Sequence, residues 1–339
     1  MAITLCKKCL MPDTRPGSLF TEGVCQACLN YEKRKNIDWN RKLSELKFLL
    51  YTANTNKQGE YPCAIPVSGG KDSHYLVWLV QSLGIKNPLL IRVGDGFGIS
   101  DAGKHNIRNL CDTFDCNMIE YTPSIKWYRD IIRKQFEELG NFPIVDQLIY
   151  TIPYNICAAM KIPALLYGED PAYEYGTSDT LTKGTDYVAS MFKASGIKPV
   201  KSDTTVSVLF ASHYQPWDGH RNYELAKRHG FHELEWNRKG TVENYDSLDI
   251  IGWQVSNFLK YRKFGYGRAS DILSRWIRSG LIDRDKALVM TNIHDGELDN
   301  RVLQDFLDFT GYKSDFWDII DKWTNLELFE NKGGIWIKK

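Results

Sequence analysis

The 339-residue chain has almost no net charge and no long hydrophobic run. Its 43 lysines and arginines nearly balance its 42 aspartates and glutamates, for a formal charge of +1. Bulk charge therefore gives no support for a protein that coats nucleic acid. The longest apolar stretch, Tyr75–Val80, is far shorter than the ~20 residues that cross a bilayer, and the N-terminus lacks an apolar signal segment. We expect a soluble, cytoplasmic protein without a membrane span.

The composition is that of a folded protein. Apolar residues make up 43% of the chain and charged residues 25%, with no internal repeat and no low-complexity segment. At roughly 150 residues per domain, the length predicts two domains, or one large domain with an appendage.

Four of the eight cysteines lie near the N-terminus in two Cys-x2-Cys pairs. These are Cys6-Lys-Lys-Cys9 and Cys25-Gln-Ala-Cys28, with 15 residues between the pairs. Two such knuckles place four thiolates around one metal ion, as in a zinc ribbon. Unrelated pairs of reduced cysteines would leave this short segment with too little apolar material to fold. We therefore predict a closed, structural zinc site, and we expect the other four cysteines to be buried, inert thiols: Cys63, Cys111, Cys116 and Cys157.

The middle of the chain alternates short apolar runs with helical patterns, which predicts an α/β fold with a doubly wound parallel sheet. Strands are expected at 63–67, 89–93, 118–121 and 164–167, and helices at 72–83, 101–115, 125–139 and 146–161. Before them we expect a linker helix at 31–50 and a loop at 52–60. Beyond residue 175 the pattern is irregular and then mainly helical, with helices expected at 245–263, 269–279, 283–291, 299–309 and 314–323.

These patterns divide the chain into four parts. They are a zinc ribbon (1–30), a linker helix and loop (31–60), a nucleotide-binding α/β domain (61–210) and a mainly helical region for substrate or partner (211–339).

A glycine-rich loop links the first central strand to the following helix. Its sequence is Ser68-Gly69-Gly70-Lys71-Asp72-Ser73. In that place backbone N–H groups and the helix N-terminus converge on an anion, and glycines let phosphates approach the backbone. It is not a Walker A loop, because Ile65 replaces that motif's first glycine and Asp72 follows the lysine. The loop resembles the PP-loop of ATP pyrophosphatases, which implies ATP binding by residues 68–73 and transfer of AMP to a substrate oxygen.

Carboxylates follow several of the predicted strands, at the edge where open α/β sheets bind ligands. Asp72 and Asp95 are candidates for the ATP site, although Asp95 also suits a turn between two glycines. Glu169 and Asp170 precede Pro171, where a helix cap is the alternative. We predict Lys71, Asp72 and Glu169 as catalytic residues, and Asp72 and Glu169 as ligands of a magnesium ion that neutralises the phosphates.

A narrower resemblance covers nearly the whole chain. The chain resembles the N-acetyl sugar amidotransferases of bacterial surface-polysaccharide synthesis, which include O-antigen and pseudaminic acid enzymes. The matching motifs, besides the cysteines and the loop, are Pro12-Asp-Thr-Arg-Pro16, Phe20, Gly23-Val24-Cys25, Gly168-Glu-Asp-Pro171, Glu174-Tyr-Gly176 and Lys263-Phe-Gly-Tyr-Gly-Arg268-Ala-Ser-Asp271.

The resemblance implies a reaction on a nucleotide-linked sugar. An acetamido oxygen is adenylated, and ammonia then displaces AMP to leave an acetamidine. It also implies a separate glutaminase, similar to the glutaminase subunit of imidazole glycerol phosphate synthase, and sometimes a cyclase-like companion. This fits the sequence, because no cysteine sits in a recognisable nucleophile motif.

The resemblance also implies substrate contacts. Glu174 and Tyr175 would face the sugar, while Lys263, Arg268 and Asp271 would line the substrate or pyrophosphate pocket. Arg268 and nearby cations suit a carboxylate or phosphate, although a solvated helix end is the alternative for 260–268.

Two other functions compete with this interpretation. A PP-loop tRNA-modifying enzyme, either a thiolase or a lysidine-type ligase, is disfavoured by the balanced charge. A catalytically inactive nucleotide-binding scaffold is disfavoured by the intact loop.

Overall fold

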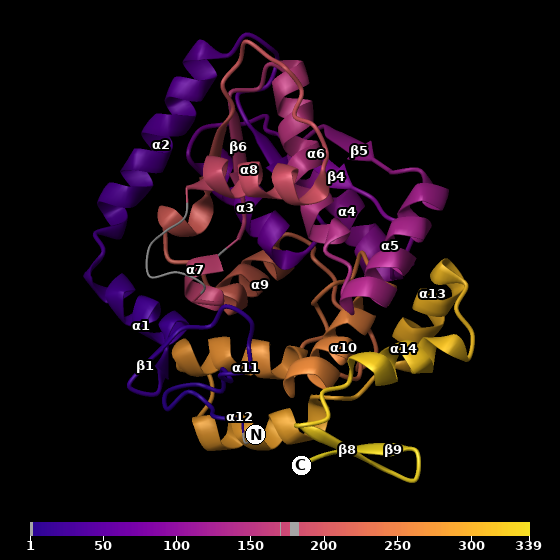
Figure 1. Ribbon diagram of the computed structural model, residues 1–339. Coiled ribbons are helices and arrows are strands. Elements are labelled where there is room, and N and C mark those ends of the chain that lie inside the picture. The colour runs from indigo at the N-terminus through magenta and orange to yellow at the C-terminus, as the bar shows by residue number, and fades with distance from the viewer. Residues whose placement is uncertain (1–2, 170, 177–182) are drawn as a thin grey trace.

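The computed structural model describes residues 3–169, 171–176 and 183–339. At its centre is a five-stranded parallel sheet with the strand order β5-β4-β3-β6-β7 (Figure 1). The strands are short and mostly buried, as a sheet covered on both faces requires. They comprise β3 (Ala64–Pro66), β4 (Leu89–Val93), β5 (Met118–Tyr121), β6 (Ala164–Tyr167) and β7 (Ser207–Phe210).

The direction in which the sheet grows reverses at β3. The chain adds β4 and β5 on one side of β3, and then returns to add β6 and β7 on the other. In open parallel sheets such a reversal leaves a crevice at the carboxyl ends of the two strands that flank it. The crevice here lies at the ends of β3 and β6.

Helices cover both faces of this sheet. Ile65 and Leu90 pack with α3 on one face, while Ala64 and Leu89 pack with α6 on the other. This alternation confirms the predicted doubly wound parallel sheet. The helices of this region are α3 (Lys71–Ser82), α4 (Asp101–Phe114), α5 (Ile125–Leu139), α6 (Ile144–Met160), α7 (Pro171–Glu174), α8 (Gly184–Ser195) and α9 (Gly219–Arg228), with η2 at Ala211–His213.

The N-terminal segment forms a small antiparallel hairpin of β1 (Phe20–Thr21) and β2 (Val24–Cys25), followed by α1 (Gln26–Lys33). The single helix expected at 31–50 is wrong in its limits. The chain breaks at η1 (Arg34–Asn36), and a new helix, α2 (Trp39–Asn56), starts where the Asp38 side chain accepts a hydrogen bond from the Arg41 N–H. α2 also takes in part of the loop expected at 52–60.

The C-terminal region is helical, and an aromatic core containing Phe136 and Phe306 joins it to α5 and α6. Helices expected at 269–279, 283–291, 299–309 and 314–323 are present within a few residues. The elements are η3 (Gly252–Gln254), α10 (Val255–Phe264), α11 (Arg268–Arg278), α12 (Arg284–His294), α13 (Asn300–Thr310), α14 (Asp315–Trp323), and the hairpin of β8 (Phe329–Lys332) and β9 (Ile335–Lys338). No helix among the described residues is both long and apolar enough to cross a bilayer.

Two expectations for the second half of the chain are wrong. The irregular stretch after residue 175 contains the fifth strand, β7, whose four residues at the sheet edge are too few to show a clear period. The helix expected at 245–263 starts only at Val255. Residues 245–251 are instead a loop that returns to the end of the sheet.

Candidate functional site

The loop at residues 68–73 lies at the carboxyl end of β3, directly before α3. Gly69 has φ +82°, and a Cβ there would come within 2.8 Å of Ile107 Cγ1, so no other residue fits without strain. The Ser68 N–H donates to Ser73 Oγ (3.1 Å), and the Gly70 N–H donates to Ser68 Oγ (3.3 Å). Both hydroxyl groups therefore keep their hydrogens available for a ligand.

Lys71 and Asp72 form the charged part of the loop. The Lys71 ammonium lies 2.7 Å from Asp72 Oδ2, and Asn222 Nδ2 donates to Asp72 Oδ1 (2.7 Å). Burial alone would lower the pKa of Lys71, but Asp72, Glu243 and Asp246 together raise it above its ordinary value. Lys71 is thus a fixed cation beside the anion-binding turn.

A cavity of about 300 Å³ opens from this loop, and we call it the main cavity. It is bordered by the ends of β3, β4 and β6, by the 245–250 loop and by α11. Most of the sequence-predicted site residues line it: Ser68, Gly70, Lys71, Asp72, Ser73, Asp95, Glu169, Glu174, Tyr175 and Arg268. Gly69 lies behind them against Ile107, and Asp170 falls outside the described residues.

Two predicted substrate residues are not in the wall of the main cavity. Lys263 Nζ donates to the carbonyl oxygens of Leu139 (2.9 Å) and Gly140 (3.2 Å), in a different part of the protein. Asp271 is buried between Arg15 Nη1 (2.6 Å) and Lys260 Nζ (2.5 Å). Burial would raise the pKa of Asp271, but these two cations hold it below its ordinary range. The contacts place Asp271 in the framework behind the cavity.

Arg268 lines the cavity, but its guanidinium already has a partner. Its Nε and Nη2 atoms lie 2.6 and 2.9 Å from the two carboxylate oxygens of Asp246. The same pairing keeps the pKa of Asp246 below its ordinary range despite burial. Arg275 is similarly paired with Glu174 (2.9 Å). A substrate anion would therefore have to compete for both arginines.

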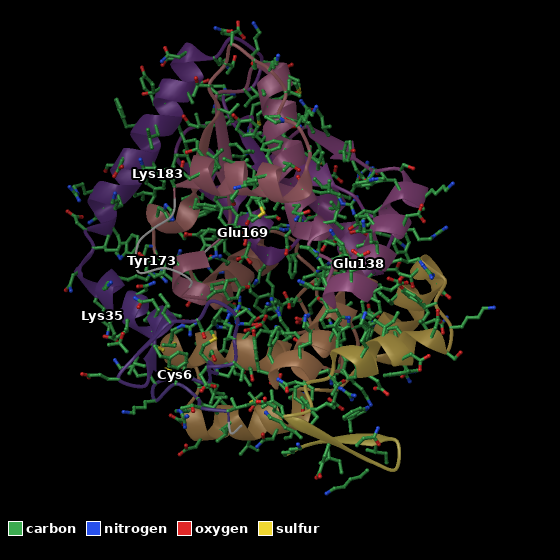
Figure 2. All side chains as sticks on the ribbon, viewed as in Figure 1. Cys6, Lys35, Glu138, Glu169, Tyr173 and Lys183 are labelled. Atoms are coloured by element: carbon green, nitrogen blue, oxygen red, sulfur yellow. The ribbon has the colours of Figure 1, made fainter. Side chains whose placement is uncertain are left out.

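Several carboxylates of the cavity have no such partner. Burial and the nearby Asp249 raise the pKa of Asp95 to about 8. Desolvation in the cavity wall and Glu174 raise the pKa of Glu169 to about 8; its side chain, labelled in Figure 2, is exposed to the cavity. Burial also raises the pKa of Asp146 and of Asp249 to about 6. A raised pKa means that these carboxyl groups ionise more readily when a cation lies beside them, so the cavity is suited to a bound cation.

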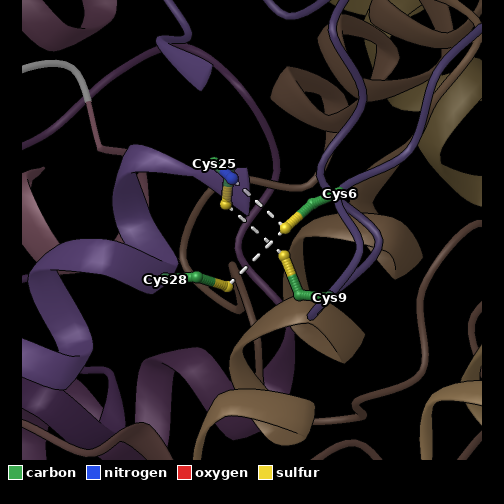
Figure 3. A group of neighbouring side chains, drawn as sticks. All are labelled: Cys6, Cys9, Cys25 and Cys28. Atoms are coloured by element: carbon green, nitrogen blue, oxygen red, sulfur yellow. Dashed lines mark hydrogen bonds between the residues drawn. The ribbon is translucent and has the colours of Figure 1, made fainter. Parts of the chain in front are cut away.

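The four N-terminal cysteines come together as predicted (Figure 3). Their sulfur atoms are buried and lie within 4.8 Å of one another, the Cys9–Cys25 pair at 3.6 Å and the Cys6–Cys28 pair at 3.9 Å. Zinc–sulfur bonds of ~2.3 Å in a tetrahedron separate sulfurs by roughly 3.8 Å. Backbone N–H groups of Lys8 and Met11 donate to Cys6 and Cys9 sulfur, as thiolates require. The group fits one zinc ion with no open position.

The cysteine cluster lies directly behind the main cavity. Arg284 of α12 donates to the carbonyl oxygens of Cys6 and Cys9. Arg278 of α11 donates to Cys9 Sγ (3.6 Å) and to the Glu174 carbonyl oxygen (3.0 Å). Figure 1 shows the N-terminal hairpin beside α11 and α12. The N-terminal cysteine segment therefore supports α11, the helix that carries Arg268 and Arg275.

Several residues of the cavity wall carry no sequence motif that identifies them. Asp246 and Asp249 lie in a segment expected to be helical, and Asp146 lies at the start of a helix without any motif. The aromatic residues Trp217, Tyr245 and Trp253 line the same cavity. The return of the 245–250 loop to the sheet brings Tyr245, Asp246 and Asp249 to the main cavity, and no local pattern encodes that return.

Comparison with known proteins gives one family match. Residues 239–339 match the family described as LPS biosynthesis protein WbpG-like, C-terminal domain. Over this region the match confirms the resemblance to surface-polysaccharide enzymes. The matched region supplies the 245–250 loop, Arg268 and Arg275 to the main cavity. No curated protein matches the chain in sequence.

Solved structures show only distant similarity to this chain. An NH3-dependent NAD synthetase from Campylobacter jejuni aligns over 82% of this chain and 98% of its own, with 15% identity and a TM-score of 0.37. A U34-tRNA thiolase, NcsA, from Methanococcus maripaludis with its [4Fe-4S] cluster aligns over 88% and 90%, with 14% identity and a TM-score of 0.35. Both scores lie below 0.5, and the fold of this chain follows from its own strand order.

Proposed function

We propose that the protein is an ATP-dependent, AMP-forming amidotransferase that converts an acetamido group of a nucleotide-linked sugar into an acetamidine, in lipopolysaccharide O-antigen or pseudaminic-type sugar synthesis. One observation carries the proposal. The Ser68–Ser73 loop and the region that matches a lipopolysaccharide biosynthesis family border the same cavity. A nucleotide-binding turn and a sugar-enzyme region thus share one reaction space.

The loop would bind the β- and γ-phosphates, with Lys71 and the start of α3 balancing their charge. Asp72 and Glu169 would hold magnesium, since both line the cavity and Mg²⁺ prefers carboxylates together with phosphate oxygens. When bound, the ion neutralises charge that develops on the departing pyrophosphate.

The chemistry has two steps. The acetamido oxygen attacks the α-phosphorus of ATP, and the bond to the β-phosphate oxygen breaks as pyrophosphate leaves. The nitrogen of ammonia then forms a bond to the activated carbon, and the C–O bond breaks so that its electron pair leaves with AMP. One proton of the added nitrogen must be removed. Solvent is the acceptor for this proton, since Glu169 would be held by the magnesium ion.

Ammonia would come from a partner glutaminase, with or without a cyclase-like subunit. The cysteines outside the cluster are poor nucleophiles, because burial raises the pKa of Cys63 to about 12 and of Cys116 to about 11, and also raises that of Cys157. Cys111 is half-buried rather than buried as expected, and burial raises its pKa too. These properties favour an external source of ammonia.

The test is to incubate the chain with ATP, magnesium, ammonium chloride and a panel of UDP- and CMP-linked acetamido sugars. We expect AMP together with a sugar in which NH replaces oxygen, detected by mass spectrometry. Asp72→Asn should abolish AMP formation, while Asp112→Asn, at an exposed position on α4, should leave it unchanged. AMP formed only with tRNA would instead support a PP-loop tRNA-modifying enzyme.

A further inference from the structure

A second cavity of about 420 Å³ lies next to the main cavity and opens to solvent. We call it the side cavity. His220 and Glu233 are exposed at its rim, while Glu243 and Tyr245 are buried at its inner end. It is bordered by α9, by the 233–245 loop and by the helices α11 and α12. The side cavity therefore leads from the surface toward the reaction space.

The two cavities share one lining residue. Among the lining residues that the structure describes, only Tyr245 borders both. Its ring stacks on Tyr223 at 4.0 Å between centroids, and the Lys71 ammonium lies 5.8 Å from its ring centroid. Movement of this one ring would connect the side cavity with the nucleotide loop.

Glu243 gives the inner end of the side cavity its chemical character. The residue is only 6% exposed, and its Oε1 accepts hydrogen bonds from the Tyr245 hydroxyl (3.0 Å) and Trp276 Nε1 (3.1 Å). No described residue donates to its second oxygen, Oε2. A carboxylate oxygen without a donor, beside the rings of Tyr223, Tyr245 and Trp276, is suited to a small cation that donates hydrogen bonds.

The charges of the side cavity disfavour an anionic ligand such as a nucleotide diphosphate. Glu233 and Glu243 are both negative. The buried Arg238 donates through Nη2 to the carbonyl oxygen of Asp246 (2.6 Å), while its Nε has no hydrogen-bond partner among the described residues. The free Oε2 atom of Glu243 favours a small nitrogen cation at the inner end of the side cavity.

We propose that the side cavity is the entry site for ammonium, with Glu243 and the surrounding rings as its binding groups. The proposal rests on the proposed function and deepens it. Ammonium bound at Glu243 gives one proton to solvent in the open cavity: an N–H bond breaks, an O–H bond forms on the accepting water, and the lone pair stays on nitrogen. Neutral ammonia then passes Tyr245 to attack the adenylated carbon.

The test compares Glu243→Gln with the wild type in two assays. Gln preserves the shape of the side chain and its acceptor for Trp276, but it removes the charge. We expect the KM for ammonium chloride to rise about tenfold or more, as loss of a charge-assisted interaction implies. ATP–pyrophosphate exchange with the acetamido sugar needs no ammonia, so we expect it to be unchanged. Glu224→Gln, exposed on α9 outside the cavity, is the matched control.

Each outcome has a distinct meaning. If the wild-type chain shows no exchange with any acetamido sugar, the proposed function is overturned, and the entry site with it. If exchange is present but Glu243→Gln keeps the wild-type KM for ammonium, only the entry site is overturned. A rise in the KM for the sugar instead of ammonium would assign the side cavity to the sugar nucleotide and also overturn this proposal.

Discussion

Replacing Arg268 with leucine tests how the wall of the main cavity is held together. Arg268 and Asp246 form a two-bond ion pair with side chains only 15% and 11% exposed. Removing one partner of a buried pair costs about 3–5 kcal/mol, because the other charge stays buried. Lys71 and Arg238 also lower the pKa of Asp246, and both would remain in the variant. We therefore expect the free energy of unfolding to fall by about 3 kcal/mol, the lower end of this range. At roughly 2 °C per kcal/mol, the Tm should fall by about 6 °C.

The assay is a double-mutant cycle measured by thermal and urea unfolding. Asp246→Asn in the Arg268→Leu background should restore much of the lost stability, since the uncompensated charge disappears. The loss in Arg268→Leu should also increase with pH, because Asp246 without its arginine ionises at a higher pH. The control is Arg108→Leu, whose pair with Asp112 is 81% and 63% exposed and should contribute almost nothing. Equal Tm changes for the two arginine variants would refute the reasoning.

Three further predictions concern the loop, two acidic residues of the main cavity and the cysteines. Gly69→Ala should lower the free energy of unfolding by about 1–3 kcal/mol and weaken ATP binding, measured by calorimetry. The control is Gly196→Ala, which should keep the affinity for ATP. Gly196 also has a positive φ (+71°), but no atom lies within 4 Å of the added Cβ. In the folded protein the pKa values of Asp95 and Glu169 are raised to about 8, so their stabilising contribution is complete at low pH and is lost as the pH rises through 8. The Tm of the ligand-free protein should therefore fall between pH 6 and pH 9. If Asp95→Asn left the dependence of Tm on pH unchanged, this prediction would be contradicted. Cys28→Ser should reduce bound zinc, measured by elemental analysis, and lower activity through Arg278 and Arg284, while Cys111→Ser should retain one zinc per chain.

The features that local sequence encodes were predictable. The cysteine pairs are spaced for one metal, and the structure brings all four sulfur atoms together. The strands at 89–93, 118–121 and 164–167 have the limits expected from their apolar runs. The glycines of the Ser68–Ser73 loop permit its backbone conformation. In each of these cases neighbouring residues supply the physical cause of the structure.

The features that long-range contacts create were not predictable. Nothing near residue 246 indicates that Asp246 pairs with Arg268, or that its loop reaches the end of the sheet. Lys263 lies close to Arg268 in sequence, but the chain turns at Gly265, with φ +76°, and α11 leaves in a new direction. Arg268 therefore lines the cavity and Lys263 does not. The motif identified the region correctly, and the tertiary fold decided which of its side chains reach the site.

The most direct measurement follows an oxygen atom. The wild-type chain is supplied with ATP, magnesium, ammonium chloride and a nucleotide-linked sugar whose acetamido carbonyl carries ¹⁸O, and the products are separated by mass spectrometry. If the carbonyl oxygen is adenylated, the label appears in AMP and the acetamidine product contains none. Label found in pyrophosphate or water, or retained in the sugar product, would contradict the proposed reaction.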